Sequence, residues 1–195
     1  MSGRITKRMS VDPAGCAEAG ALLRAGKLVA FPTETVYGLG ADATNALAVA
    51  GIYEAKGRPR FNPLIIHVSG LDDAMKLAVF SPRAEELAHH FWPGPLTLVL
   101  PLREGAAISD LALAGHSSIA LRVPSHPVAR AIIEASHCPI AAPSANRSGH
   151  VSPTLANHVL EDLDGRIDAV VMGEASDVGV ESTILSLLDE RAILL

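Results

Sequence analysis

The sequence predicts an α/β fold in which helices flank a sheet on both sides. Segments with apolar residues at helical spacing alternate along the chain with short runs of aliphatic and β-branched residues, which is the order typical of this class. These short runs are almost continuously apolar, so we expect the sheet to be covered on both faces over much of its area. Since 49% of the 195 residues are apolar and only 4% are aromatic, the core is expected to be mainly aliphatic.

The helices are predicted from their periodicity and from the residues at their ends. Asp12 and Pro13 form a start signal and Gly26 a stop signal for the first helix, because Asp caps a helix N-terminus, Pro suits the first turn and Gly the end. Ser81 and Ser152, each followed by proline, are similar start signals, and an N-cap is the expected structural role of Ser152. The predicted helices span residues 12–26, 46–56, 72–80, 81–91, 126–136 and 152–163.

The strands are predicted where apolar runs lie between these helices. They span residues 27–32, 64–68, 96–100, 118–123, 140–142, 167–172 and 183–188. Residues 103–116 are expected to form a long loop, residues 1–12 a loose N-terminal arm and residues 13–195 a single domain, because one core serves chains of about 100 to 200 residues. The arm carries basic residues with no apolar run after them, unlike a secretory signal.

The charge and the cysteine content exclude several classes of protein. The formal net charge is −5, so no overall positive field attracts nucleic acid or anionic membranes. Cys16 and Cys138 are far apart and lack metal-ligand spacing, which argues against a disulfide framework or a zinc knuckle and fits a reducing cytoplasm. The longest stretch without Asp, Glu, Lys or Arg, residues 87–102, contains two histidines and three prolines, and so no membrane span is expected.

The polar residues of interest gather where the predicted strands end. They occupy five segments, which are residues 32–40, 56–67, 117–122, 143–152 and 179–183. Ligands of open α/β sheets usually bind at strand ends, so these segments predict one composite site. The string from Gly38 to Ala43 matches the dinucleotide fingerprint, but residues intervene between it and the preceding strand and no acidic residue follows at the required distance, which disfavours that interpretation.

Two of these segments have both a functional and a purely structural interpretation. The loop after residue 56 carries Lys56, Arg58 and Arg60, which suit a phosphate group but equally complement the negative end of the preceding helix. The turn over residues 141–149 can direct amides and hydroxyls at an oxyanion, or it is an ordinary Asx or Ser turn. His67 is a lone histidine within a strand, and the spacing of the histidines predicts no metal site.

Taken together and in order, six motifs resemble the YrdC/YciO family, and within it the threonylcarbamoyl-AMP synthases. The motifs are FPTETVYGLG (31–40), KGRP (56–59) with NPLIIH (62–67), FWPGPLTL (91–98), RVP (122–124), PSANRSG (143–149) and EST (181–183). The resemblance spans about residues 13–188 and implies a twisted, mostly parallel sheet flanked by helices, with a large, locally positive concave cavity. It further implies a cytoplasmic nucleotidyltransferase that forms L-threonylcarbamoyladenylate and pyrophosphate from L-threonine, bicarbonate or CO2, and ATP.

The resemblance also assigns roles to individual residues. For L-threonine, the implied binding residues are Thr35, His67, Arg122, the backbone of Ala142, and Ser182. For ATP, they are Lys56, Arg58, Asn62, Ser118, Ser144, Asn146 and Ser152, with Lys56 and Arg58 stabilising charge during catalysis. Mg2+ is expected to accompany ATP and to be held mainly by its phosphates rather than by protein ligands. The product is expected to pass to a threonylcarbamoyl-transferase that makes N6-threonylcarbamoyladenosine (t6A) in tRNA.

One departure from the family and three alternative functions stay open at this point. The family continues after the last strand into an Arg-Pro-Gly segment whose arginine helps to bind ATP, and no such segment occurs in residues 189–195, so we expect weaker ATP binding without it. The alternatives are a non-catalytic module with weak tRNA or RNA binding, a paralogue with another substrate or none, and the carbamoyl-adenylate chemistry of hydrogenase-maturation proteins. Thr35, His67 and Arg122 favour the synthase.

Overall fold

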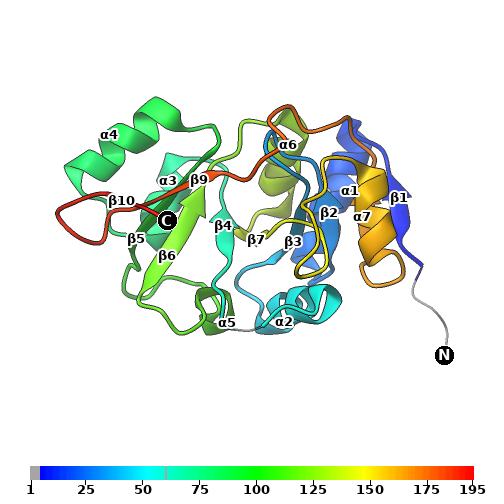
Figure 1. Cartoon of the computed structure of the whole chain (residues 1–195), viewed down its shortest axis with the longest axis horizontal. Helices are drawn as coiled ribbons and strands as arrows, with labels where there is room; N and C mark the ends of the chain where they lie inside the picture. Colours follow the sequence, from blue (N-terminus) through cyan, green and yellow to red (C-terminus); the bar gives the residue numbers. More distant parts are fainter. Residues whose placement is uncertain (1–4, 60) are drawn as a thin grey trace.

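The computed structural model describes residues 5–59 and 61–195 and contains a mixed sheet flanked by helices. The order of strands across the sheet is β1-β8-β2-β3-β7-β4-β6-β5-β9-β10, with β1 and α1 at one end of the molecule and β10 and α4 at the other (Figure 1). The strands are β1 (Lys7–Met9), β2 (Val29–Phe31), β3 (Gly38–Asp42), β4 (Ile65–His67), β5 (Leu96–Pro101), β6 (Ser118–Arg122), β7 (Ile140–Ala141), β8 (Ala169–Val171), β9 (Thr183–Ser186) and β10 (Ile193–Leu194).

The helices confirm the periodicity of the sequence. They are α1 (Pro13–Arg24), α2 (Ala46–Lys56), α3 (Leu71–Leu77), α4 (Pro82–Phe91), α5 (Asp110–Leu113), α6 (Pro127–Ser136) and α7 (Ala156–Leu163). Asp12 caps α1 by accepting a hydrogen bond from the Gly15 amide (2.8 Å), and Ser81 caps α4 by accepting one from the Ala84 amide (3.2 Å). The expected loop over residues 103–116 contains the short helix α5.

Ser152 does not cap α7, contrary to the prediction. The helix begins at Ala156, and its N-cap residue, Leu155, has no side-chain cap bond. The preceding residues are held in another conformation by partners distant in sequence, because the Tyr37 amide donates to the Pro153 carbonyl oxygen (2.8 Å) and the Ser152 hydroxyl donates to the Glu181 carboxylate. Ser152 therefore belongs to the loop that leads into α7.

The sheet is mixed rather than mostly parallel. The parallel pairs are β1–β8, β2–β8, β4–β6 and β5–β9, and the antiparallel pairs are β2–β3, β3–β7, β4–β7, β5–β6 and β9–β10. A parallel neighbour needs a crossover of a dozen or more residues, whereas only residues 32–37 separate β2 from β3, so β3 returns antiparallel. No predicted strand corresponds to β3. At Gly40 a Cβ atom would lie 2.7 Å from the Phe31 ring, which explains glycine in a buried strand.

The expected N-terminal arm includes an ordered edge strand. Lys7–Met9 pair with Ala169–Val171 of β8, Met9 is buried, and Lys7 and Arg8 are exposed. Basic residues at a sheet edge disfavour pairing with another chain. Because Lys7 and Arg8 leave no apolar run in this segment, no strand was predicted here. Arg4, another basic residue of the arm, lies outside the described residues.

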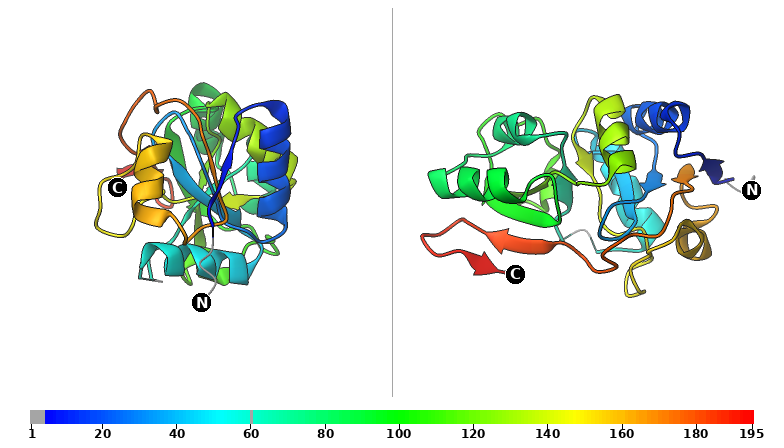
Figure 2. Two further views of the ribbon diagram at one scale, coloured as in Figure 1. Left: turned by 90° about the vertical axis from the view of Figure 1, so that its right-hand side faces the viewer. Right: turned by 90° about the horizontal axis from the view of Figure 1, so that it is seen from above.

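The two faces of the sheet pack against different helices, as the apolar strands predicted. Val29 and Phe31 of β2 pack with residues of α1 and α6, whereas Ala30 belongs to the cluster that contains residues of α2 and α7. This alternation follows from the two-residue period of a strand, and Figure 2 shows α1 and α6 side by side on one side of the sheet. None of the described helices combines the length and apolarity that crossing a bilayer requires.

The contact between α1 and α6 is tight enough to require a glycine. A Cβ atom at Gly20 of α1 would lie 2.7 Å from backbone and side-chain atoms of Ala135 and Ser136, whereas one at Gly51 of α2 would lie 3.4 Å or more from the Leu28 side chain. We predict that Gly20→Ala lowers the free energy of unfolding by about 1 to 3 kcal/mol through overpacking. Gly51→Ala is the matched control and is expected to be neutral or stabilising by up to about 1 kcal/mol. Urea denaturation of both variants measures the difference, and equal effects would contradict this packing argument.

Candidate functional site

The five predicted polar segments meet at one pocket of about 100 Å3. The pocket is lined by Thr33, Thr35, Val36, Gly38, Ile65, His67, Arg122, Ala142, Pro143, Ser144, Glu181, Ser182 and Ile184. All five residues that the resemblance assigned to L-threonine are in this lining, together with Ser144 from the nucleotide set. Pockets for drug-sized ligands measure about 300 to 1,000 Å3, and the large concave cavity therefore stays a prediction.

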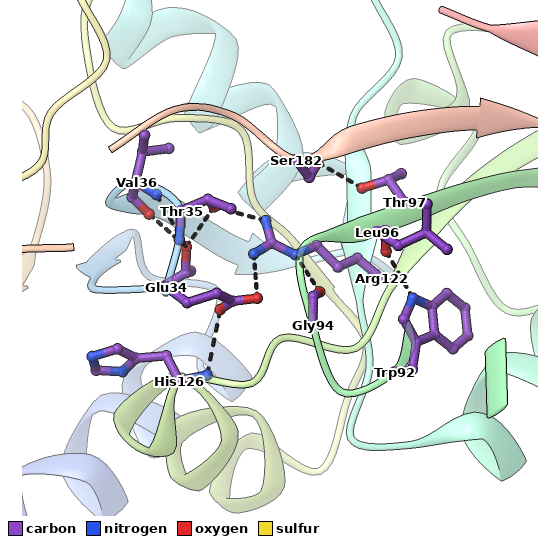
Figure 3. Close-up of polar contacts among 11 residues, drawn as sticks. Glu34, Thr35, Val36, Trp92, Gly94, Leu96, Thr97, Arg122, His126 and Ser182 are labelled. Atoms are coloured by element: carbon purple, nitrogen blue, oxygen red, sulfur yellow. Dashed lines mark hydrogen bonds and ion pairs between the residues drawn. The ribbon is translucent and has the colours of Figure 1, made fainter. Parts of the chain in front are cut away.

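Arg122 is the buried cation at the centre of the site. It ends β6, and its guanidinium makes three hydrogen bonds to the protein (Figure 3). Nη2 donates to Glu34 Oε1 (2.6 Å), Nη1 to Thr35 Oγ1 (2.9 Å) and Nε to the Gly94 carbonyl oxygen (3.3 Å). A guanidinium has five N–H donors. Among the described residues these three bonds leave one N–H on each terminal nitrogen for a ligand.

Glu34 is the site residue that sequence reasoning missed. Its Oε1 forms an ion pair with Arg122 at 2.6 Å, its Oε2 accepts a hydrogen bond from the His126 amide (3.3 Å), and its side chain is 9% exposed. Burial by itself raises the pKa of this carboxyl group, but the charge and hydrogen bond of Arg122 outweigh burial and hold the pKa below its usual value. The sequence did contain a signal for Glu34, because this carboxylate lies in a segment bounded by Phe31 and Tyr37. Charged side chains are rarely buried unless they are paired, so a charged partner was to be expected.

A hydroxyl cluster gives the 32–37 loop its shape. Thr33 Oγ1 donates to the Val36 carbonyl oxygen (2.7 Å) and accepts from the amides of Thr35 and Val36 (3.2 and 3.3 Å). The Thr33 and Thr35 hydroxyl oxygens are 2.9 Å apart. Because these bonds are local to the loop, they fix the Thr35 hydroxyl where it can accept from Arg122 and still face the pocket.

His67 lies beside Arg122 on the neighbouring parallel strand, β4. Its side chain is buried, and Nδ1 has no hydrogen-bond partner among the described residues. Burial, followed by the positive charge of Arg122, lowers the pKa of His67 to about 3, against a smaller opposing effect of Glu34. The imidazole is therefore neutral near pH 7, and its buried Nδ1 is an unsatisfied polar atom in a residue that lines the pocket.

The other two residues of the threonine set have protein partners. The Ser182 and Thr97 hydroxyl oxygens are 2.8 Å apart, which joins the start of β9 to the buried strand β5 (Figure 3). The Ala142 amide donates to the Ile65 carbonyl oxygen (3.0 Å), so this N–H group is already occupied. Both residues lie at the pocket wall, at the end of a strand.

Lys56 holds a turn rather than facing open solvent. Its ammonium group, at the end of α2, donates to the carbonyl oxygens of Ser144 and Asn146 and lies 3.4 Å from Asn146 Oδ1. Its own carbonyl oxygen accepts from the Ser148 amide (2.8 Å). Burial and the nearby charge of Arg58 lower the pKa of Lys56 to about 8. The three ammonium donors are thus directed at the 144–146 backbone and at the Asn146 side chain.

The remaining nucleotide candidates are not in the lining of this pocket. Arg58 Nη2 donates to the Pro63 carbonyl oxygen (3.4 Å), and its buried Nε has no partner among the described residues. The Asn62 carbonyl oxygen accepts from the Tyr53 hydroxyl (2.9 Å), and Ser118 is at the opposite end of β6 from Arg122. Arg60 lies outside the described residues.

Asn146 and Ser152 connect the turn to other parts of the site. Asn146 Nδ2 donates to the carbonyl oxygens of Arg147 and His150 (3.0 and 2.7 Å). The Ser152 hydroxyl donates to Glu181, which lines the pocket beside Ser182. Within the described part of the chain, no three His, Cys, Asp or Glu side chains gather in a way that would hold a metal ion.

The sequence and the structure are both similar to those of known proteins. Residues 21–195 match the family model Sua5_yciO_yrdC, which is described as "Telomere recombination". The chain belongs to this family. It is 51% identical over 192 residues to the threonylcarbamoyl-AMP synthase of Bacillus subtilis, covering 98% of this chain and 55% of that protein. It is 51% identical over 178 residues to the Pyrococcus abyssi enzyme of the same name, covering 91% and 52% of the two chains.

Solved structures of family members have the same fold. The structure of P. abyssi Sua5 complexed with L-threonine superposes with a TM-score of 0.91 at 48% identity, covering 98% of this chain and 56% of that one. Escherichia coli YciO superposes with a TM-score of 0.88 over 98% of this chain and 95% of its own. At 20% identity, this second likeness shows the fold alone. The chain spans about half the length of the curated relatives that it matches.

The buried ion pair predicts a large loss of stability when one partner is removed. We expect Glu34→Ala to lower the free energy of unfolding by about 3 to 5 kcal/mol, because it leaves the Arg122 charge buried without its partner. Glu134→Ala removes one member of an exposed pair with Arg130 at 3.9 Å, and this control is expected to change stability by less than about 0.5 kcal/mol. Urea denaturation at pH 7 measures both. Similar losses in the two variants would contradict the role given to Glu34.

The neutral state of His67 predicts a loss of stability in mild acid. Below pH 6.5 the unfolded chain takes up a proton at this residue, whereas the folded chain does not until the pH approaches about 3, so stability falls as the pH falls through this window. Between pH 7 and pH 5 this residue is expected to cost about 2 kcal/mol. The free energy of unfolding should therefore depend less on pH in His67→Asn than in the wild type or in the exposed-site control His116→Asn. The same pH dependence in all three proteins would show that His67 takes up its proton normally.

Proposed function

We propose that the chain forms L-threonylcarbamoyladenylate and pyrophosphate from L-threonine, bicarbonate or CO2, and ATP. The observation that carries this proposal is the Arg122 guanidinium, which is held by Glu34, Thr35 and Gly94 and keeps an N–H on each terminal nitrogen at the pocket. Guanidinium N–H groups form charge-assisted hydrogen bonds with the oxygens of a carboxylate. The relatives named threonylcarbamoyl-AMP synthase and the family structure with bound L-threonine support an amino acid as the ligand.

The rest of the pocket suits the polar groups of threonine. Thr35, His67, Ala142 and Ser182 line the space next to Arg122, and they offer hydroxyl, imidazole and backbone groups. The uncharged amine nitrogen of threonine bonds to the carbon of CO2 and gives up a proton to the solvent, which yields a carbamate. A carbamate oxygen then bonds to the α-phosphorus of ATP while the bond to pyrophosphate breaks. The neutral His67 adds no positive charge beside the amine that must lose its proton.

The nucleotide is assigned to the side of the pocket formed by the 144–150 turn. Ser144 and Asn146 belong to this turn, Ser152 follows it, and Arg58, Asn62 and Ser118 are the further nucleotide candidates. Transfer of a nucleotidyl group depends mainly on positioning and on stabilisation of charge. Arg58, whose half-buried side chain makes one hydrogen bond through Nη2 among the described residues, is suited to contact a phosphate through its terminal nitrogens. Lys56 contributes its charge through the turn that it holds.

The metal and the cellular role follow from the same proposal. The described residues offer no cluster that would bind Mg2+ on its own, so the ion enters with ATP on the phosphate oxygens, where it neutralises charge.

The product would pass to a threonylcarbamoyl-transferase that modifies tRNA in the cytoplasm. Binding of RNA by a non-catalytic module gains no support from a net charge of −5, because affinity for a phosphate backbone needs clustered cations.

Release of pyrophosphate tests the proposed function. Purified protein with ATP, Mg2+ and bicarbonate is expected to release pyrophosphate only when L-threonine is added, with formation of a species of the mass of threonylcarbamoyl-AMP. L-serine, which lacks the methyl group, is the matched substrate control and is expected to react about tenfold or more slowly. Release that is independent of the amino acid, or no release with any amino acid at saturating ATP, would overturn the proposal.

A further inference from the structure

The turn over residues 144–150 is held from two opposite sides. On one side, the Lys56 ammonium group donates to the carbonyl oxygens of Ser144 and Asn146, as described above. On the other side, Asp162 of α7 uses both carboxylate oxygens: Oδ2 accepts from the Arg147 amide (3.0 Å), and Oδ1 is 2.8 Å from His150 Nδ1. The turn therefore lies between a buried cation and a carboxylate that come from different helices.

The Asn146 side chain connects these two attachments. Its Nδ2 donates to the carbonyl oxygens of Arg147 and His150, which are the two residues that Asp162 binds. Its Oδ1 faces the Lys56 ammonium group at 3.4 Å. A continuous set of hydrogen bonds thus runs from Asp162 through residues 147 and 150 to Asn146 and then to Lys56. Removing the carboxylate frees the residues whose carbonyl groups orient Asn146.

The charges of Asp162 and Lys56 support the same arrangement as these hydrogen bonds. Burial raises the pKa of Asp162, but the Arg147 amide and His150 outweigh it, so that the pKa is lower than usual and the group is ionised near pH 7. The negative charge of Asp162 also favours the charged form of Lys56 against burial. The opposite charges of Asp162 and Lys56 therefore favour the ionised state of both groups.

We propose that Asp162 is a positioning residue for the nucleotide half of the site, acting through the 144–150 turn. This inference rests on the proposed function, which assigns ATP to that turn. Asp162 does not line the pocket that contains Arg122; it lines a separate cavity of about 300 Å3 on the other side of the turn, together with His150, Ser152, His158 and Glu161. Its removal should consequently weaken the binding of ATP and leave the binding of L-threonine unchanged.

Calorimetric titrations of ATP and of L-threonine into wild type, Asp162→Ala, Asp162→Asn and Glu161→Ala test this proposal. Glu161 is the matched control, because it lies on the same helix and lines the same cavity but makes no hydrogen bond to the turn among the described residues. We expect Asp162→Ala to raise the Kd for ATP roughly tenfold or more, with the Kd for L-threonine changed less than about twofold. Asp162→Asn keeps an acceptor for the Arg147 amide and should show a smaller, equally selective effect. Glu161→Ala should match the wild type.

The outcomes separate this inference from the proposed function. If the wild type binds both ligands and the two Asp162 variants bind ATP as tightly as Glu161→Ala does, Asp162 has no positioning role. Equal weakening of ATP and L-threonine would also overturn the proposal, because it would indicate general disruption of the fold. If Asp162→Ala does not fold by circular dichroism, Asp162→Asn decides the question by the same two titrations. A wild type that binds neither ligand would overturn the proposed function itself, and this inference with it.

Discussion

The ion pair between Arg122 and Glu34 is the interaction on which the site depends. Two charges are removed from water at the end of a buried strand, which is costly unless they are paired and their remaining donors and acceptors are satisfied. The protein meets this requirement with the Thr35 hydroxyl, the Gly94 carbonyl oxygen and the His126 amide. Satisfying Arg122 therefore fixes the relative positions of β6, the 32–37 loop and the start of α6, before any ligand binds.

The same loop also organises the segments that cross the site. The Val178 and Gly179 amides donate to the carbonyl oxygens of Glu34 and Thr35 (2.9 and 3.0 Å), and the Ala145 amide donates to the Tyr37 carbonyl oxygen (2.8 Å). These backbone bonds bring residues 178–182 and the 144–150 turn against one loop. The pocket is therefore assembled around one hydrogen-bonded segment.

The site divides into two halves with different electrostatics. Near Arg122 the positive charge is paired with Glu34 and adjoins a neutral His67. Around the turn, the Lys56 charge is directed at carbonyl oxygens and is accompanied by Asp162. Each half therefore contains a buried cation and an acidic residue from another element, which are joined directly in the first half and through the turn in the second. That shared arrangement explains how a chain with a net charge of −5 can present local positive charge to anionic ligands.

Local signals in the sequence predicted the helices well. The features that were not predicted, such as the start of α7 and the role of Glu34, depend on long-range hydrogen bonds. Helix α2 has the predicted bounds, since its periodicity is uninterrupted up to Gly57, whose φ of 60° suits glycine at a helix end. The start of α7 was wrong because residues 152 and 153 are bonded to residues 181 and 37. The gathering of polar strand ends was predicted correctly, but Glu34 was missed because its partner lies 88 residues further along the chain.

On the proposed function, the two remaining N–H groups of Arg122 receive the carboxylate of L-threonine. Titration of the wild type with L-threonine and with L-threoninol, in which a hydroxymethyl group replaces the carboxylate, tests this role of Arg122. The double variant Glu34→Gln/Arg122→Gln is the control, because it removes both charges of the pair together. We predict that the wild type binds L-threonine at least about tenfold more tightly than L-threoninol and that the double variant loses this preference. Equal affinity of the wild type for the two compounds would contradict the account.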